Sequence, residues 1–186
     1  KSLPAASTFG ERASLLTDLA SSSQKNYVII SSLRAALSAI PPASYLRDRV
    51  LNLRVGHKVN FENLKAELSS LGYLRVPRVS LQGEFSVKGE IIEIYPFEDN
   101  YAVRIILDFD QIEELKKFEV ITQRSISTLE EITIGPVREV QIDDRLLETL
   151  KRNLKKFKLP GQTHMEIVEK IVECSSDICI ELFFPL

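Results

Sequence analysis

The chain has 186 residues and a formal net charge of −2, with 24 lysines and arginines against 26 aspartates and glutamates. Its 44% hydrophobic and 27% charged residues exclude a disordered tail, a collagen-like chain and a low-complexity sequence. No apolar run approaches the roughly 18 residues of a membrane span, and the near-neutral charge argues against a domain that binds nucleic acid by neutralising phosphates. The composition therefore predicts a soluble chain of one medium domain or two small ones.

The two ends of the chain suggest a piece of a longer protein. The only methionine is Met165, and no apolar signal segment follows Lys1.

Near the other end of the chain, Cys174 and Cys179 lie five residues apart, a spacing that fits no common zinc site. We expect two reduced thiols there.

The first fifty residues predict part of an α/β layer. A helix is expected over 8–23, where Thr8 and Glu11 have the spacing of a capping box. The apolar run 27–31 is typical of a strand buried on both faces. A short helix with Leu33, Leu37 and Ile40 on one side should follow and end at Pro41 and Pro42.

The next segment predicts a strand and a well-defined helix. Residues 43–56 are expected to be a connector that leads into a strand ending at Gly56. Apolar residues repeat with helical spacing over 60–71, where Asn60 is the expected N-cap. Gly72 and Tyr73 then predict a Schellman-type end of this helix.

From 73 to 134 the pattern becomes β. Five strands joined by short turns predict an antiparallel meander, and Pro77 places the first strand at an edge or near one. The expected strands are 73–79, 84–95, 101–109, 112–120 and 126–134.

Two of these strands carry further information. The alternation of apolar and polar residues shifts by one position across Gly89, which favours a β-bulge there. In the third strand, alternate residues should face the core, namely Tyr101, Val103, Ile105, Leu107 and Phe109. The opposite face would then expose Ile106 between a cation and an anion, an arrangement that suits a binding partner.

The last third predicts helices at 143–158 and 163–174 and a strand at 178–184. Five cations occur between 151 and 158, at Lys151, Arg152, Lys155, Lys156 and Lys158. They favour a helix end whose dipole they complement, and a DNA-binding module is the alternative hypothesis.

The sequence shows no pattern of catalytic chemistry. It lacks a phosphate-binding loop, a dinucleotide fingerprint and the common hydrolase motifs. His57 and His164 are expected in solvated positions, and the acidic residues Asp108, Asp110, Glu113 and Glu114 lack the spacing of a calcium loop. The residues thus predict a non-catalytic binding module with no metal or cofactor.

Several segments resemble the amino-terminal region of the bacterial transcription-repair coupling factors (Mfd). They are 71–79 (LGYLRVPRV), 83–96 (GEFSVKGEIIEIYP), 103–105 (VRI), 118–125 (FEVITQRS) and 180–186 (IELFFPL). The excision-repair protein UvrB shares this module and supplies an alternative, although 123–125 (QRS) favours the coupling factors.

The resemblance implies an α/β plus α+β fold in three parts. Residues 1–50 would end a degenerate nucleotide-binding-like α/β subdomain, 51–133 would form a small antiparallel β-rich domain that recruits UvrA, and 134–186 would begin another α/β subdomain. The intact family member is a cytoplasmic, ATP- and Mg-dependent DNA translocase that displaces stalled RNA polymerase on duplex DNA. Those activities would lie outside this chain.

The resemblance also implies the residues that bind UvrA. The basic residue before the bulge glycine is Lys88, and the arginine of the third strand is Arg104. Ile106 stands where the family usually has an acidic residue, and Asp108 stands where it usually has an aromatic one, with Phe109 displaced by one position. We expect these four residues, Lys88, Arg104, Ile106 and Asp108, to form the contact surface.

Overall fold

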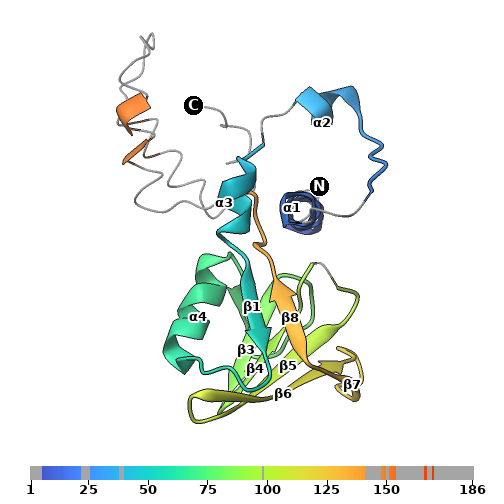
Figure 1. Cartoon of the computed structure of the whole chain (residues 1–186), viewed down its shortest axis with the longest axis vertical. Coiled ribbons are helices and arrows are strands. Elements are labelled where there is room, and N and C mark those ends of the chain that lie inside the picture. The colour runs from blue at the N-terminus through green and yellow to red at the C-terminus, as the bar shows by residue number, and fades with distance from the viewer. Residues whose placement is uncertain are drawn as a thin grey trace. The chain divides into compact units, whose positions relative to one another are not determined.

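The computed structural model describes residues 6–21, 26–37, 40–97 and 99–140, and seven positions beyond them (Figure 1). Those seven positions are 148–149, 151–153, Glu166 and Glu169, and all of them are helical. The expected strand 178–184 and Cys174 and Cys179 lie outside the described residues. The chain divides into two compact units, Lys1–Lys25 with Pro42–Glu139 and Asn26–Pro41 with Val140–Leu186.

The first unit is built on a six-stranded sheet with the order β2-β3-β4-β5-β6-β7. The strands are β2 (Leu74–Arg75), β3 (Glu84–Lys88), β4 (Ile91–Ile94), β5 (Ala102–Asp108), β6 (Gln111–Phe118) and β7 (Ser125–Leu129). The meander is confirmed from β3 to β7, where every neighbouring pair is antiparallel. The edge position of β2 is confirmed, but β2 pairs parallel with β3 because the chain returns through the loop 76–83 and makes no hairpin there.

A second, two-stranded sheet joins the two ends of the β-rich segment. β1 (Leu51–Arg54) pairs antiparallel with β8 (Glu131–Ile134). The expected strand 126–134 is therefore two strands that belong to different sheets. Between them, the carbonyl of Glu130 accepts a hydrogen bond from the amide of Val55 at 2.9 Å.

The expected bulge at Gly89 is wrong, because the segment 84–95 is a hairpin. Lys88 pairs with Ile91, so Gly89 and Glu90 form a two-residue turn, with Gly89 at a φ of 59°. Such a turn pairs odd-numbered with even-numbered residues, and Val87 lies opposite Ile92. The slip in apolar phase is the result of this pairing.

The helix ends agree with the sequence only in part. α4 (Phe61–Ser70) has the predicted caps: Asn60 accepts a hydrogen bond from the amide of Asn63, and the amide of Tyr73 bonds the carbonyl of Leu68. α1 (Ala6–Ser21) is already helical at Ala6, so Thr8 is not its N-cap. The connector 43–56 contains an unpredicted helix, α3 (Ala43–Arg47).

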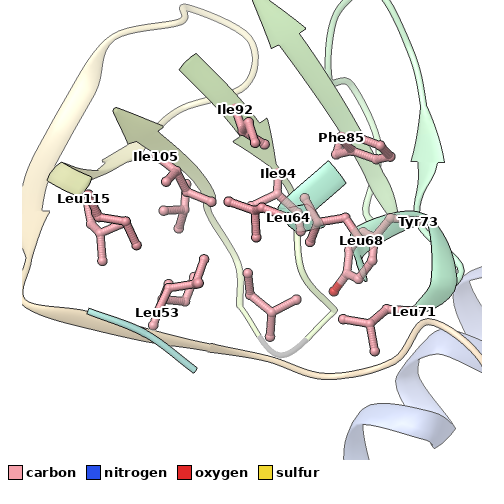
Figure 2. Packing of buried hydrophobic residues seen from close by; sticks show 14 of the residues in the cluster. Leu53, Leu64, Leu68, Leu71, Tyr73, Phe85, Ile92, Ile94, Ile105 and Leu115 are labelled. Carbon is pink, nitrogen blue, oxygen red and sulfur yellow. The ribbon is translucent and has the colours of Figure 1, made fainter. Parts of the chain in front are cut away.

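The main core lies between α4, one face of the six-stranded sheet, and β1 and β8. Figure 2 shows Leu64 and Leu68 of α4 directed at Phe85, Ile94 and Ile105 of the sheet. Tyr101, Val103, Ile105 and Leu107 contribute to this core as predicted. Phe109 does not, because it occupies the turn after β5 with a φ of 51° and is 85% exposed.

In the second unit, the expected doubly buried strand at 27–31 is not observed. No described strand pairs with residues 26–32, and Val28 and Ile30 are more than 90% exposed. A short helix, α2 (Leu33–Leu37), follows at the predicted place, but Leu33, Leu37 and Ile40 are exposed. The described fold is thus mixed α/β, with one six-stranded sheet that is mostly antiparallel, a two-stranded sheet and short helices. Within the described ranges, no helix has the length and hydropathy needed to cross a bilayer.

The core predicts the effect of shortening a leucine of α4. Leu68 is 0% exposed, whereas Leu74 on β2 is 64% exposed. Leu68→Ala should lower the free energy of unfolding by about 2–5 kcal/mol, because it removes buried apolar surface and leaves a cavity. Urea unfolding followed by circular dichroism measures the difference. Leu74→Ala is the matched control, and an equal loss in both variants would contradict this packing.

Candidate partner-binding face of the sheet

The four predicted contact residues lie on the face of the six-stranded sheet that is turned away from the main core. Arg104, Ile106 and Asp108 alternate with the buried residues of β5, so their side chains share this outer face. Lys88 ends β3, two strands away from Arg104. β4 lies between them and brings its own side chains into the group.

Two rows of side chains run across the strands on this outer face. Cross-strand pairing places the first row in the order Ser86, Glu93, Arg104, Lys116 and Thr128. It places the second row in the order Lys88, Ile91, Ile106 and Glu114. Directly opposed side chains lie close enough to interact, so each row is a continuous surface feature.

One end of the outer face is covered by the chain itself. Val79 packs there against Ala102 and Phe118, and all three are fully buried. This small second cluster closes the face at the start of β5. The half-buried Ile106 and the exposed Asp108 lie toward the other end of the strand.

The centre of the first row is a buried carboxylate, Glu93, which the sequence analysis did not single out. The residue is only 3% exposed. Nε and Nη2 of Arg104 both donate to Oε1 of Glu93, at 2.9 and 2.6 Å. Oε2 accepts hydrogen bonds from Ser86 Oγ at 3.1 Å and from Lys88 Nζ at 3.3 Å. The signal in the sequence was one acidic residue within the apolar strand 91–94.

The cations and the hydroxyl group keep Glu93 ionised. Burial alone would raise the pKa of Glu93, but the hydrogen bond from Arg104, the charge of Lys88 and the hydrogen bond from Ser86 together hold that pKa below its ordinary value. At neutral pH the cluster Lys88–Glu93–Arg104 therefore has two positive charges and one negative charge. Its net charge is +1.

The two cations are not equally accessible. The guanidinium of Arg104 lies 4.8 Å from the centre of the Phe118 ring, and its side chain is only 20% exposed. The side chain of Lys88 is 52% exposed. Lys88 is thus the more accessible charge, and Arg104 is held between Glu93 and an aromatic ring.

Ile106 and Asp108 extend the outer face beyond this cluster. Ile106 lies opposite Ile91 and is half-buried, so it is less exposed than the sequence suggested. Asp108 is exposed at the end of β5, next to the exposed ring of Phe109. The outer face therefore combines a positive cluster, a small apolar pair and an acidic end.

The other candidate residues do not gather into a site. His57 is exposed in the turn after β1, Asp110 pairs with Lys58 at 3.0 Å, and Glu114 pairs with Lys116. Among the described residues, no three histidines, cysteines or acidic side chains lie close enough together to hold a metal ion. Of the basic run, the described Lys151 and Arg152 are exposed, whereas Lys155, Lys156, Lys158 and His164 lie outside the described residues.

Comparison with known proteins places this sheet in a family. Residues 51–139 match the family model of the UvrB interaction domain. The transcription-repair-coupling factor of Borreliella burgdorferi is 34% identical over 179 residues, which cover 96% of this chain and 15% of that protein. The factor of Bacillus subtilis is 32% identical over 73% of this chain and 12% of its own length. UvrABC system protein B of Thermosipho africanus is 28% identical over 77% of this chain and 22% of its own length. The chain thus spans under a quarter of each of these relatives.

The lowered pKa of Glu93 predicts that this residue contributes to the free energy of unfolding in a pH-dependent way. Because its pKa is lower in the folded chain, this contribution is complete above the ordinary glutamate range near about pH 4.3 and is lost as the pH falls through the folded pKa. Glu93→Gln should lower the free energy of unfolding at pH 7 by about 1–3 kcal/mol, since it leaves Arg104 without its charged partner. The difference in the free energy of unfolding between Glu93→Gln and the unmodified chain should become smaller below about pH 4.

Urea unfolding between pH 3 and pH 8 measures this effect. Glu113→Gln, at an exposed position of β6, is the control and should change stability by less than about 0.5 kcal/mol at any pH. A difference between Glu93→Gln and the unmodified chain that stays constant with pH would contradict the assigned role of the carboxylate.

Proposed function

Residues 51–139 are a UvrB interaction domain, the chain is homologous to the amino-terminal region of the transcription-repair-coupling factors, and we therefore propose that the chain recruits the excision-repair protein UvrA. This recruitment would take place during transcription-coupled nucleotide excision repair. The chain acts as a non-catalytic binding module. Its contact surface is the outer face of the six-stranded sheet, with Lys88, Arg104, Ile106 and Asp108.

The observation that carries this proposal is the buried cluster around Glu93. A flat sheet face has little shape of its own, so a partner needs fixed chemical features to recognise it. Glu93 and Phe118 hold the guanidinium of Arg104 in one orientation, while Lys88 presents an accessible ammonium group. Fixed cations attract and orient carboxylates of a partner and speed the encounter.

The remaining two residues shape the rest of the contact. Ile106 and Ile91 form an apolar pair beside the cluster, and a bound partner can exclude water from the surface of this pair. Asp108 adds a negative charge at the far end of the outer face. Opposite charges at two ends of one surface favour a single orientation of the partner.

The other activities of the longer relatives belong, in this proposal, to parts outside this chain. ATP and Mg²⁺ binding, displacement of RNA polymerase and translocation along duplex DNA would reside there, in the bacterial cytoplasm. Within this chain, the described residues include no cluster of side chains that could hold a metal ion. This division assigns the chain to recruitment alone.

Lys88 provides the direct test, because its removal leaves Glu93 paired with Arg104. Lys88→Ala should weaken the affinity for UvrA by about tenfold, since the accessible charge of the cluster is lost. Isothermal titration of the 186-residue chain with purified UvrA measures the dissociation constant. Arg54→Ala, an exposed cation on β1 of the other sheet, is the matched control and should bind normally. Equal affinities for the two variants would remove Lys88 from the site, and no binding by the unmodified chain would refute the proposed function.

Arg104 needs a different variant, because removing it alone would leave Glu93 buried without its main partner. The double change Glu93→Gln with Arg104→Gln removes both charges and keeps side chains of similar size. It should fold and yet bind UvrA at least about tenfold more weakly than the unmodified chain. The same titration, with circular dichroism to confirm folding, decides the matter. Full affinity in this double variant would exclude Arg104 from the contact.

A further inference from the structure

Two cations face each other across neighbouring strands on the outer face of the sheet. Lys116 of β6 lies directly opposite Arg104 of β5. Their neighbours Leu115 and Ile105 are buried in the main core, so Lys116 and Arg104 lie on the outer face. Directly opposed residues have Cβ atoms about 4.5–5.5 Å apart, and like charges at this separation destabilise a sheet. The chain therefore holds an unfavourable pair of positive charges at this position.

Each of the two cations already has one carboxylate, but the two carboxylates are different. Oε1 of Glu93 accepts the hydrogen bonds from Nε and Nη2 of Arg104, and Glu114 forms an ion pair with Lys116. Along the row, Glu93 lies on the far side of Arg104 from Lys116. Among the described residues, no carboxylate pairs with both cations, and Nη1 of Arg104 makes no hydrogen bond. The repulsion between the two cations is thus only partly compensated.

The two carboxylates differ in how firmly they are held. Glu93 is buried and bound on both oxygens. The side chain of Glu114 is 43% exposed and that of Lys116 is 29% exposed. Exposed ion pairs contribute little to stability, because water solvates both partners well. Glu114 is therefore a partner that Lys116 can exchange for another carboxylate, whereas Glu93 stays with Arg104.

We propose that Arg104 and Lys116 together bind one carboxylate of UvrA, which displaces Glu114 from Lys116. This inference rests on the proposed function and names the chemistry of that contact. Arg104 presents a guanidinium in a fixed orientation, and Lys116 adds an ammonium group on a flexible stem beside it. A carboxylate bound to both cations accepts charge-assisted hydrogen bonds and removes their mutual repulsion. Lys116 is thus a contact residue in addition to the four predicted ones.

The next residue of the same strand supplies a matched control. Lys117 is half-buried, as Lys116 is, but it lies on the inner face of the sheet. Its Nζ lies 3.8 Å from the centre of the Tyr101 ring. Lys116→Gln and Lys117→Gln therefore remove the same charge one position apart, on opposite faces.

Isothermal titration of the 186-residue chain with purified UvrA tests the pair, with circular dichroism to confirm folding. Lys116→Gln should weaken the affinity by about fivefold, because one of the two cations around the carboxylate is lost. Lys116→Arg should bind within about twofold of the unmodified chain, since the charge is kept. Glu114→Gln should bind about threefold more tightly, because no internal carboxylate competes for Lys116. Lys117→Gln should bind normally.

Salt separates a charge contact from a change in packing. The loss caused by Lys116→Gln should shrink between about 0.05 M and about 0.5 M sodium chloride, because salt screens the charge that is removed. A loss that is constant with salt would overturn the assigned contact. Equal affinities for Lys116→Gln and Lys117→Gln, with Lys88→Ala still weakened, would overturn this inference and leave the proposed function in place. No binding by the unmodified chain would overturn both.

Cross-linking identifies the chemistry of the partner directly. A carbodiimide joins an ammonium group to a carboxylate only where the two are in contact. The variant Glu114→Gln removes the internal carboxylate that would otherwise react with Lys116. In the complex of this variant with UvrA, mass spectrometry should find Lys116 joined to an aspartate or glutamate of UvrA. Cross-links from Lys117 as frequent as those from Lys116, or none from Lys116, would overturn the proposal.

Discussion

Glu93 is almost fully removed from water in the middle of a sheet, and a carboxylate can remain charged there only if it is bound on both oxygens. Arg104 occupies one oxygen, and Ser86 and Lys88 occupy the other. These contacts join β3, β4 and β5 on their outer face, while the apolar residues of the same strands join them on the inner face. The arrangement of the outer face therefore follows from the need to satisfy one buried charge.

One face of the sheet packs the core, and the other carries the proposed contact surface. α4 covers the inner face with leucines, and Val79 in the loop before β3 packs on the outer face against Ala102 and Phe118. A strand with alternating apolar and polar residues thus supplies the core on one side and a chemically defined surface on the other.

The local signals at the ends of α4 and along β5 were reliable, whereas the expected N-cap at Thr8 was wrong and pairing between distant segments was not readable. Asn60, Gly72 and Tyr73 fix the ends of α4 through contacts within a few residues, and the alternation of β5 shows which residues face the core. Gly89 is compatible with a bulge and with a two-residue turn, because both need a positive φ. Only the pairing of Lys88 with Ile91 separates the two possibilities. Glu93 was missed for the same reason, since its partner Arg104 is eleven residues away and meets it only through strand register.

The same cluster also limits what a partner can gain. Part of the positive charge of Arg104 is already neutralised by Glu93, so a carboxylate on the partner meets a net charge of +1 on the cluster and not +2. Against this loss, the guanidinium is already ordered by Glu93 and Phe118, and binding does not have to immobilise a long flexible side chain. The cluster therefore attracts a carboxylate less strongly than two free cations would, but it presents the guanidinium in a fixed geometry. A surface of this kind favours selection among partners over tight binding, as the proposed recruitment of one repair protein requires.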